Sequence, residues 1–200
     1  DVVARLIAPL ASAPSIGGYS LSDIYAMIVA MHAENQLYLS RTVLAYALET
    51  DEATLDQGPL RLLRSEAVLD SGGTYILTRH RRIAEAARDW LVETGAGVDR
   101  WYPWLARAAL LQFLRQRPSM HDMTKWSRDL PRYFAQQPRN RWPVAVAVAR
   151  ALFEVDPTDP ISLTSYSSTL RRTGNPGFAL DLMRRAAPAF SRHRGVLYEW

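Results

Sequence analysis

The hydrophobic positions of the first hundred residues predict a mainly helical fold. After a break at Gly17-Gly18, apolar residues recur at intervals of three and four, which is typical of a helix with one apolar face. These residues are Ile24, Met27, Ile28 and Met31. Ser20 or Ser22 is suited to cap this helix, because a side-chain oxygen there accepts hydrogen bonds from the N–H groups of the first turn.

Two further helices are predicted before residue 66. One runs from Ser40 to about Glu49, and the other begins after Asp51, which can cap it. Pro59 lacks an N–H and crowds the preceding turn. We therefore expect the second of these helices to kink or to restart near Gly58.

A small β-hairpin and a closing helix complete this half. Val68-Leu69 and Tyr75-Ile76-Leu77 form two short apolar runs on either side of Gly72-Gly73, where glycine tolerates a positive φ. A helix with one apolar stripe is then predicted from about Arg81 to Val92. Three helices, a hairpin and a last helix are the order of a winged helix-turn-helix domain, which we assign to residues 20–94.

Beyond a break at Gly95–Gly97 the pattern predicts helices and no strands. Five segments have helical spacing: "WYPWLARAALLQFLRQRP", "MHDMTKWSRDLPRYFAQQP", "RWPVAVAVARALFEVDP", "DPISLTSYSSTLRRTG" and "NPGFALDLMRRAAPAF". The first is expected to begin after Pro103 and to end by Pro118, and Pro131 is expected to disturb the second. Pro143 stands in the first turn of the third, where a missing N–H is harmless. Short turns separate the segments, so we expect an array of antiparallel helix pairs.

The last two segments fit a helical repeat. A tetratricopeptide unit of about 34 residues has apolar positions in its first helix, glycine at the turn and small or aromatic residues along its second helix. From Pro160 the matching residues are Leu163, Tyr166, Leu170, Gly174, Ala179, Met183 and Ala186. The preceding unit fits only in its second helix, so the repeat register of residues 98–157 stays open. The predicted fold is mainly α, with a winged helix followed by tetratricopeptide-like repeats over residues 98–200.

The composition of the chain narrows the range of possible functions. The chain has no cysteine, which excludes thiolate nucleophiles and cysteine-ligated zinc and suits a reducing compartment. No uninterrupted apolar run reaches the roughly 18 residues that span a bilayer. We therefore expect a cytoplasmic protein without membrane contact. Residues 1–100 carry nine arginines and thirteen acids, a net charge of −4, whereas residues 101–200 carry fourteen arginines, one lysine and seven acids, a net charge of +8.

The winged helix raises the alternative of DNA binding. A helix that reads the major groove needs donors and positive charge near its N-terminal end. Here that end carries Asp51, Glu52 and Asp56, which repel phosphate. Five arginines could hold a nucleic-acid backbone without reading its sequence; they are Arg61, Arg64, Arg79, Arg81 and Arg82. Sequence-specific DNA binding is therefore not expected.

A protein or peptide partner is expected on the helical repeats. The end of the first helix of a repeat borders the concave groove of such arrays, so Arg171 is the best candidate contact, together with Thr164 and Ser168. An acidic peptide would suit this arginine. The aromatics of residues 101–142 have helical spacing and are expected in the core rather than on a base-stacking platform; they are Trp101, Tyr102, Trp104, Trp126, Tyr133, Phe134 and Trp142.

Catalytic patterns are missing from the sequence. The four histidines, His32, His80, His121 and His193, are scattered and lack the paired spacing of a zinc helix. There is no phosphate-binding GxxxxGK[ST] loop and no GxSxG nucleophile motif. We expect no catalytic residues, no cofactor and no metal, and an enzyme of unfamiliar type ranks as the third hypothesis.

Two stretches carry a family resemblance. The segment "LSRTVLAYALETDEATLDQGPLRLLRSEAVLDSGGTYILTRHRRIAEAA" and residues 160–190 together resemble the region that follows the nucleotide-binding domain in STAND-class signal-transduction ATPases. The resemblance implies a winged helix that packs on an NTPase domain upstream in the same chain, and repeats that recognise a ligand or protein. Residues 1–19 would be a linker or the end of a preceding domain, and the repeats would be truncated at the C-terminus. The expected function is a non-catalytic regulatory and protein-interaction module; a DNA-binding transcriptional regulator is the alternative.

Overall fold

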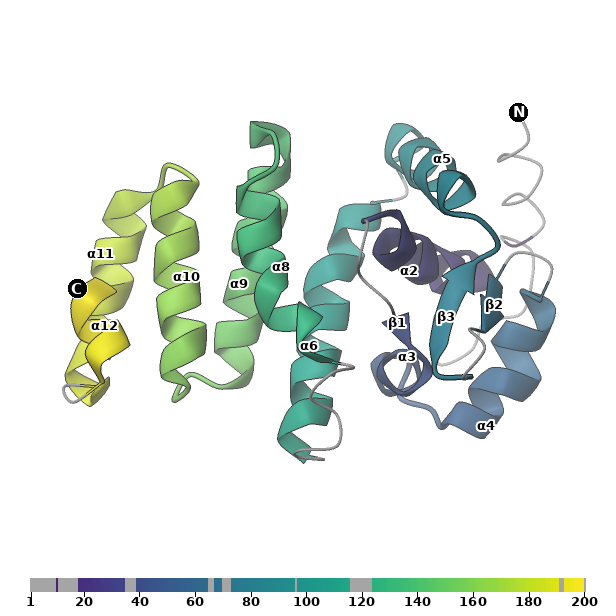
Figure 1. Cartoon of the computed structure of the whole chain (residues 1–200), viewed down its shortest axis with the longest axis horizontal. Coiled ribbons are helices and arrows are strands. Elements are labelled where there is room, and N and C mark those ends of the chain that lie inside the picture. The colour runs from purple at the N-terminus through teal and green to yellow at the C-terminus, as the bar shows by residue number, and fades with distance from the viewer. Residues whose placement is uncertain are drawn as a thin grey trace. The chain divides into compact units, whose positions relative to one another are not determined.

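The computed structural model describes residues 10, 18–34, 39–64, 67–69, 73–95, 97–115, 124–190 and 193–199. It confirms a mainly helical protein with a small antiparallel sheet (Figure 1). The chain divides into two compact units, residues 1–108 and residues 109–200. The predictions for Gly17, Gly72, Pro118, His121 and residues 1–9 concern positions outside the described residues.

Helix α2 (Leu21–Ala33) is the interior helix of the first unit. Ser20 is its N-cap: the Ser20 hydroxyl oxygen accepts from the Asp23 N–H at 3.1 Å, and the Asp23 carboxylate accepts from the Ser20 N–H at 3.1 Å. This reciprocal capping box fixes the start of the helix. The predicted apolar face is buried, but the other sides are buried as well, at Tyr25, Ala26, Val29 and Ala30. A helix that is apolar on all sides belongs in a core.

A three-stranded sheet in the order β1–β3–β2 accompanies α2. The predicted hairpin is confirmed as β2 (Ala67–Leu69) and β3 (Tyr75–Thr78), which run antiparallel. Gly73 has a φ of +67°, as the turn requires. The pattern does not reveal β1 (Leu39–Ser40), because a strand of two residues has no readable alternation.

The remaining helices of the first unit begin at the predicted caps. α3 (Arg41–Ala47) follows its N-cap Ser40, and α4 (Glu52–Leu55) follows its N-cap Asp51, whose carboxylate accepts from the Thr54 N–H at 2.8 Å. The helix neither stops nor restarts at Gly58. It widens into a π-helical turn, Asp56–Leu60, which makes room for the ring of Pro59. α5 (Arg81–Glu93) begins at its N-cap His80 and packs against α2.

The division between the units falls within α6 (Trp101–Arg115), after the glycine break at residues 95–97 rather than at it. The helix begins at Trp101, two residues before the predicted start at Pro103. Its aromatic first turn belongs to the first unit, because the Tyr102 hydroxyl donates to the Glu34 carboxylate at 2.9 Å and Trp104 Nε1 donates to the Ala47 carbonyl oxygen at 3.2 Å. These contacts hold residues 101–108 to the first unit.

The helices of the second unit up to Ala186 match the predicted segments, and a further helix, Arg194–Glu199, lies beyond the last of them. Their bounds are α8 (Trp126–Ala135), α9 (Trp142–Val155), α10 (Pro160–Arg172), α11 (Pro176–Ala186) and α12 (Arg194–Glu199). α8 continues through Pro131, which is buried within it. Pro143 lies in the first turn of α9, and Gly174 has a φ of +80° in the turn between α10 and α11, as expected.

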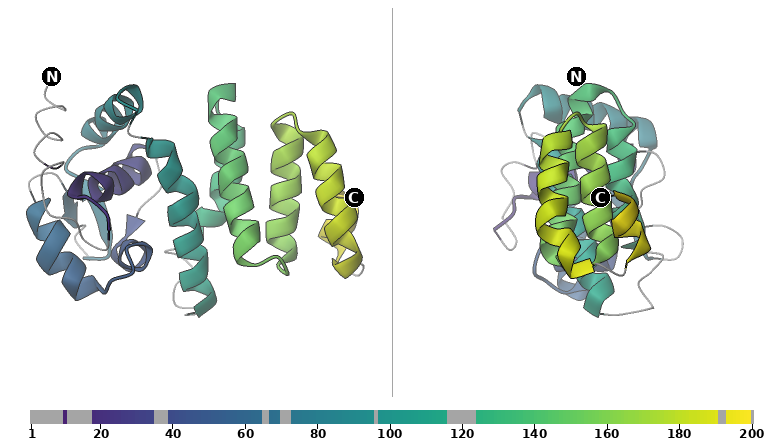
Figure 2. Two further views of the ribbon diagram at one scale, coloured as in Figure 1. Left: turned by 180° about the vertical axis from the view of Figure 1, so that it is seen from behind. Right: turned by 90° about the vertical axis from the view of Figure 1, so that its left-hand side faces the viewer.

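These helices lie side by side and are joined by short turns (Figure 2). α10 packs against its sequence neighbours α9 and α11 and also against α8 and α12, two helices away in each direction. α10 therefore lies at the centre of the unit's helix packing. Of the inward positions predicted from the repeat pattern, Leu163, Leu170, Ala179 and Met183 are buried, whereas Tyr166 and Ala186 are half-buried.

Two further expectations concern burial and membranes. Of the aromatics predicted in the core, Trp101, Tyr102, Trp126 and Phe134 are buried, Tyr133 and Trp142 are half-buried, and Trp104 is 37% exposed. In the part of the chain that the structure describes, no helix combines the length and the apolar character that crossing a bilayer requires.

Candidate ligand-binding groove

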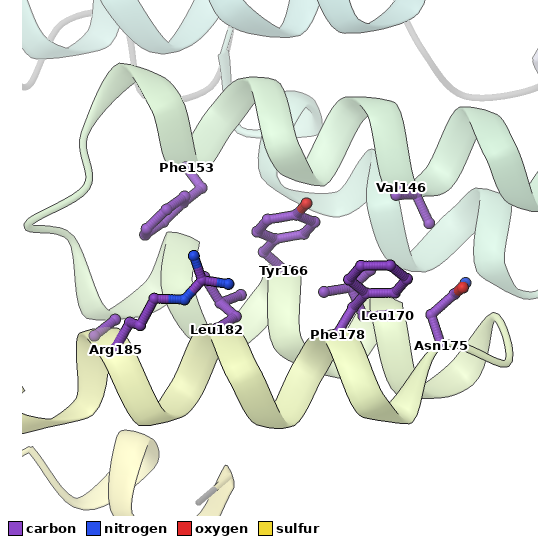
Figure 3. A pocket seen from close by; sticks show the side chains of 9 residues that line it. Val146, Phe153, Tyr166, Leu170, Asn175, Phe178, Leu182 and Arg185 are labelled. Atoms are coloured by element: carbon purple, nitrogen blue, oxygen red, sulfur yellow. The ribbon is translucent and has the colours of Figure 1, made fainter.

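An apolar groove opens on the second unit between α9 and α11 (Figure 3). It has a volume of about 520 Å³. Its lining residues come from three helices and the turn that precedes α11: Val146, Phe153, Tyr166, Leu170, Asn175, Phe178, Leu182, Arg185 and Ala186. α9 and α11 run along its two sides, and α10 supplies Tyr166 and Leu170 between them.

Helical spacing places these side chains together. On α11, Phe178, Leu182 and Arg185 stand at positions i, i+4 and i+7 and therefore share one face. The adjacent stripe of α11 holds Ala179 and Met183, which are buried and attach the helix to the unit. The groove face is thus the stripe next to the core stripe, and it remains open to solvent.

Aromatic rings dominate the groove. The rings of Phe153 and Tyr166 lie 5.9 Å apart with an interplanar angle of 37°. Phe178 is 69% exposed, the highest value among the large apolar side chains described as exposed. An exposed ring of this size beside other apolar side chains marks an interaction surface more often than a single scattered residue does.

One cation extends over the groove. The Arg185 guanidinium points into it toward Phe153 (Figure 3). Arg185 Nε donates to the Asp181 carbonyl oxygen at 3.2 Å, and among the described side chains no carboxylate forms an ion pair with this arginine. The guanidinium can therefore accept an anionic group without first breaking a salt bridge.

A second hollow adjoins the groove and shares Val146 and Asn175 with it. Its volume is about 590 Å³, and it extends from Arg139, in the turn before α9, along that helix to Glu154. The Arg150 Nε lies 2.7 Å from Glu154 Oε1, and this hydrogen bond, together with the charge of Glu154, raises the pKa of Arg150. Arg139 lies over the Trp142 ring at 5.4 Å from its centroid.

The residues predicted as partner contacts lie elsewhere on α10. Thr164, Ser168 and Arg171 share one face of this helix, at positions i, i+4 and i+7. Tyr166 lies about 200° around the helix from Thr164, at about 100° per residue. None of the three predicted residues lines the groove, and the Thr164 hydroxyl donates back to the Pro160 carbonyl oxygen at 2.9 Å. The structure brings them together on one face, but a different one from the groove.

The sequence contained a signal for the groove that the repeat pattern obscured. That pattern assigns the positions of a repeat that face inward, and Phe178 is not one of them. The repeat pattern does not require an apolar residue at position 178, so the phenylalanine found there is the signal for a binding surface. Arg185 follows Phe178 two helical turns later on the same face of the helix.

The five arginines proposed as nucleic-acid contacts are all exposed in the first unit. Arg79 Nη2 donates to the Arg64 carbonyl oxygen at 3.3 Å, so the Arg79 side chain lies against the backbone at Arg64. Arg81 pairs with Glu85 at 2.9 Å. Among the described side chains, the other four form no ion pair with a carboxylate; they are Arg61, Arg64, Arg79 and Arg82.

The acids expected to repel phosphate are partly neutralised. Arg41 Nε lies 2.9 Å from Glu52 Oε2, and Arg41 Nη1 lies 2.8 Å from Asp56 Oδ2. Asp51 stays exposed as the helix cap, and its hydrogen bonds to Thr54 lower the pKa of its carboxyl group. The negative charge around α4 is therefore smaller than the sequence alone indicates.

Histidine and carboxylate groups do not assemble into a metal site in the described residues, where no three His, Asp or Glu side chains come close enough to hold an ion. His32 has a structural role: its Nδ1 accepts from the Thr78 N–H at 3.1 Å. Burial, and then the charges of Arg81 and His80, lower the pKa of His32.

Comparisons with family models, with curated proteins and with solved structures found no match.

Proposed function

We propose that this chain is a non-catalytic protein-interaction module, in which the second unit binds a partner and the first unit is a scaffold or hinge. The observation that carries the proposal is the open aromatic groove with Phe178 at its rim and Arg185 over it. Aromatic residues and arginine are the residue types enriched where protein interfaces bind most strongly. The groove's polar groups are a phenol, an amide and a guanidinium, which suit binding rather than proton transfer.

The order of elements in the first unit supports a winged helix. A helix, a short strand, two helices, a hairpin and a last helix follow one another, and β1 pairs with β3. In this proposal the unit contacts protein, as in the region after the nucleotide-binding domain of STAND-class ATPases. The chain is then a cytoplasmic regulatory segment of a larger signalling NTPase, and the helix pairs of the second unit are its tetratricopeptide-like sensor.

Photo-crosslinking tests the interaction function. A photoreactive phenylalanine analogue at position 178, in the full-length gene product in its native cells, is expected to crosslink to another polypeptide. The same analogue at Leu180 is the control, because Leu180 is 43% exposed on the same helix but does not line the groove. Equal crosslinking from both positions, or none from position 178, contradicts the proposal.

Sequencing of the gene upstream of Asp1 tests the STAND assignment. We expect a phosphate-binding loop with its lysine to be encoded there. If the upstream sequence lacks this loop, the STAND assignment is wrong, whereas the interaction function of the groove is unaffected.

The alternative function is DNA binding by the first unit. It is favoured by the four exposed arginines without a described carboxylate partner and by the pairing of Glu52 and Asp56 with Arg41. We expect no tight, sequence-selective mobility shift of duplex DNA at about 150 mM salt, where phosphate contacts are strongly screened. If such a shift appears and the triple substitution Arg79→Ala, Arg81→Ala and Arg82→Ala abolishes it, the alternative replaces the proposal.

A further inference from the structure

We infer that the groove between α9 and α11 binds an acidic amphipathic helix that inserts an aromatic or leucine side chain between Phe153 and Phe178. The inference rests on the proposed interaction function and names the chemistry of its partner. Four observations carry it: the openness of the groove, its length, its few hydrogen-bonding groups and its charge.

The openness of the groove indicates a macromolecule rather than a small ligand. Sites for small molecules bury most of the ligand surface. Here Phe178, which forms one wall, is 69% exposed. A small ligand in this groove would remain largely in water, whereas a partner with its own surface can cover the ring and the groove together.

The length of the groove fits two turns of a helix. Phe178 and Ala186 mark its ends on α11, and eight residues at about 1.5 Å each give a length of about 12 Å. A helix laid in such a groove presents anchors at positions i and i+4 or i and i+7. The apolar stretch from Phe178 to Leu182 matches one such pair.

The polar groups of the groove favour a helix over an extended peptide. A buried extended strand leaves its N–H and C=O groups unsatisfied unless the site supplies partners for them. Tyr166, Asn175 and Arg185 are the polar side chains that line the groove, and Asn175 already donates to the Thr173 carbonyl oxygen at 3.1 Å. A helix satisfies its own backbone and needs no partners from the groove.

The charge of the groove indicates acidic residues beside the anchors. Arg185 has no carboxylate partner among the described side chains, and the same is true of Arg139 in the adjoining hollow. Glu154 is held by Arg150 at 2.7 Å, so it leaves little free negative charge there. A carboxylate of the partner, one turn from the anchor that meets Phe178, can pair with Arg185 and fix the direction of the helix.

Selection from a peptide library tests this inference. The 200-residue chain is immobilised, and phage-displayed random peptides of about 16 residues are selected, which is long enough for four helical turns. We expect enriched peptides with aromatic residues or leucine at i and i+4 or i and i+7, and with aspartate or glutamate between or beside them. A synthetic peptide of the enriched sequence then gives a Kd by fluorescence anisotropy.

Two substitutions and their matched controls locate the bound peptide. Phe178→Ser and Arg185→Glu are each expected to weaken binding at least about tenfold, as the loss of an interface hot spot does. Leu180→Ser and Arg184→Glu change neighbouring exposed residues of the same helix outside the groove lining, so their Kd values should stay within about twofold of the unsubstituted chain. Circular dichroism of each variant confirms that α11 is retained.

The outcomes separate this inference from the proposed function. Peptides that bind all four variants equally but lose binding with Arg171→Glu overturn the groove and leave the interaction function in place. Enriched peptides that are basic, or that lack apolar anchors, overturn the partner chemistry. If no peptide is enriched, the short acidic helix is rejected, and the crosslinks from position 178 decide separately whether the unit binds protein.

Discussion

Replacement of Tyr102 by phenylalanine tests how α6 is attached to the first unit. Tyr102 is fully buried, and its hydroxyl group lies 2.9 Å from Glu34 Oε1 and 3.1 Å from the Ala30 carbonyl oxygen. Glu34 is only 5% exposed, and Arg88 Nη1 lies 3.5 Å from the same Oε1 atom. The substitution removes one oxygen and leaves the ring in place, so it isolates the hydrogen bonds from the packing.

The expected loss in the free energy of unfolding is about 2 kcal/mol. A hydrogen bond to a charged group contributes about 1.5–3 kcal/mol, because removal of the donor leaves a buried acceptor unsatisfied. Arg88 stays near Glu34 and limits the loss, which keeps the estimate below the upper end of that range.

Urea unfolding followed by circular dichroism measures the effect, and hydrogen exchange of the α2 peptides assigns the transition to the first unit. Tyr166→Phe is the control, because the Tyr166 hydroxyl lies in the open groove and has no described hydrogen bond. If the two substitutions reduce stability equally, or Tyr102→Phe costs less than about 0.5 kcal/mol, the attachment argument fails. A double-mutant cycle with Glu34→Gln should show a coupling of about 1–2 kcal/mol.

Three further predictions concern stability. Arg41→Ala should destabilise the first unit by about 1 kcal/mol in urea unfolding, because it leaves Glu52, at the start of α4, and Asp56, directly after its end, without their shared partner. Burial lowers the pKa of His32 below its usual 6.5, so the unfolded chain binds this proton more readily than the folded chain. The stability that His32 contributes is therefore present above pH 6.5 and is lost as the pH falls through the pKa of His32 in the folded protein. In the His32→Asn variant, the melting temperature should depend less on pH in this range. Gly174→Ala should lower the melting temperature, at a cost of about 1 kcal/mol, because its φ is +80°, whereas Gly177→Ala in the first turn of α11 should be neutral or stabilising.

Local chemistry made most of the helices predictable. Ser20, Asp51 and Pro143 act within one turn of the backbone they cap or begin, so their effect can be read from a few neighbouring letters. The π-helical turn at Pro59 could not be read in this way, because proline forbids a regular turn without saying whether the chain breaks or widens. Tertiary packing decides between the two.

The charge around α4 and the groove could not be predicted from the sequence, because both depend on contacts between residues far apart in the chain. The pairing of Arg41 with Glu52 and Asp56 spans 11 and 15 residues and reduces a negative charge that looks unopposed in the sequence. The groove is formed by α9, α10 and α11 together. Which face of α11 stays exposed depends on how α11 packs against α10, and the sequence does not show this packing. For the same reason the predicted contact residues Thr164, Ser168 and Arg171 identify a face of α10 but not the groove.

Phe178 and Arg185 of the second unit differ from Arg41 and Tyr102 of the first unit in how their side chains are satisfied, and this difference supports the proposed binding site. In the first unit, Arg41 and Tyr102 are satisfied by groups of the same unit, and their loss is expected to cost stability. In the second unit, Phe178 is 69% exposed and Arg185 has no described carboxylate partner. The substitutions Phe178→Ser and Arg185→Glu should therefore leave the fold almost unchanged. Folding therefore does not explain why an exposed aromatic ring and a guanidinium without a described carboxylate partner share one face of α11. A partner that covers the ring and pairs with the cation does explain it, because both groups gain their interactions only when that partner is bound.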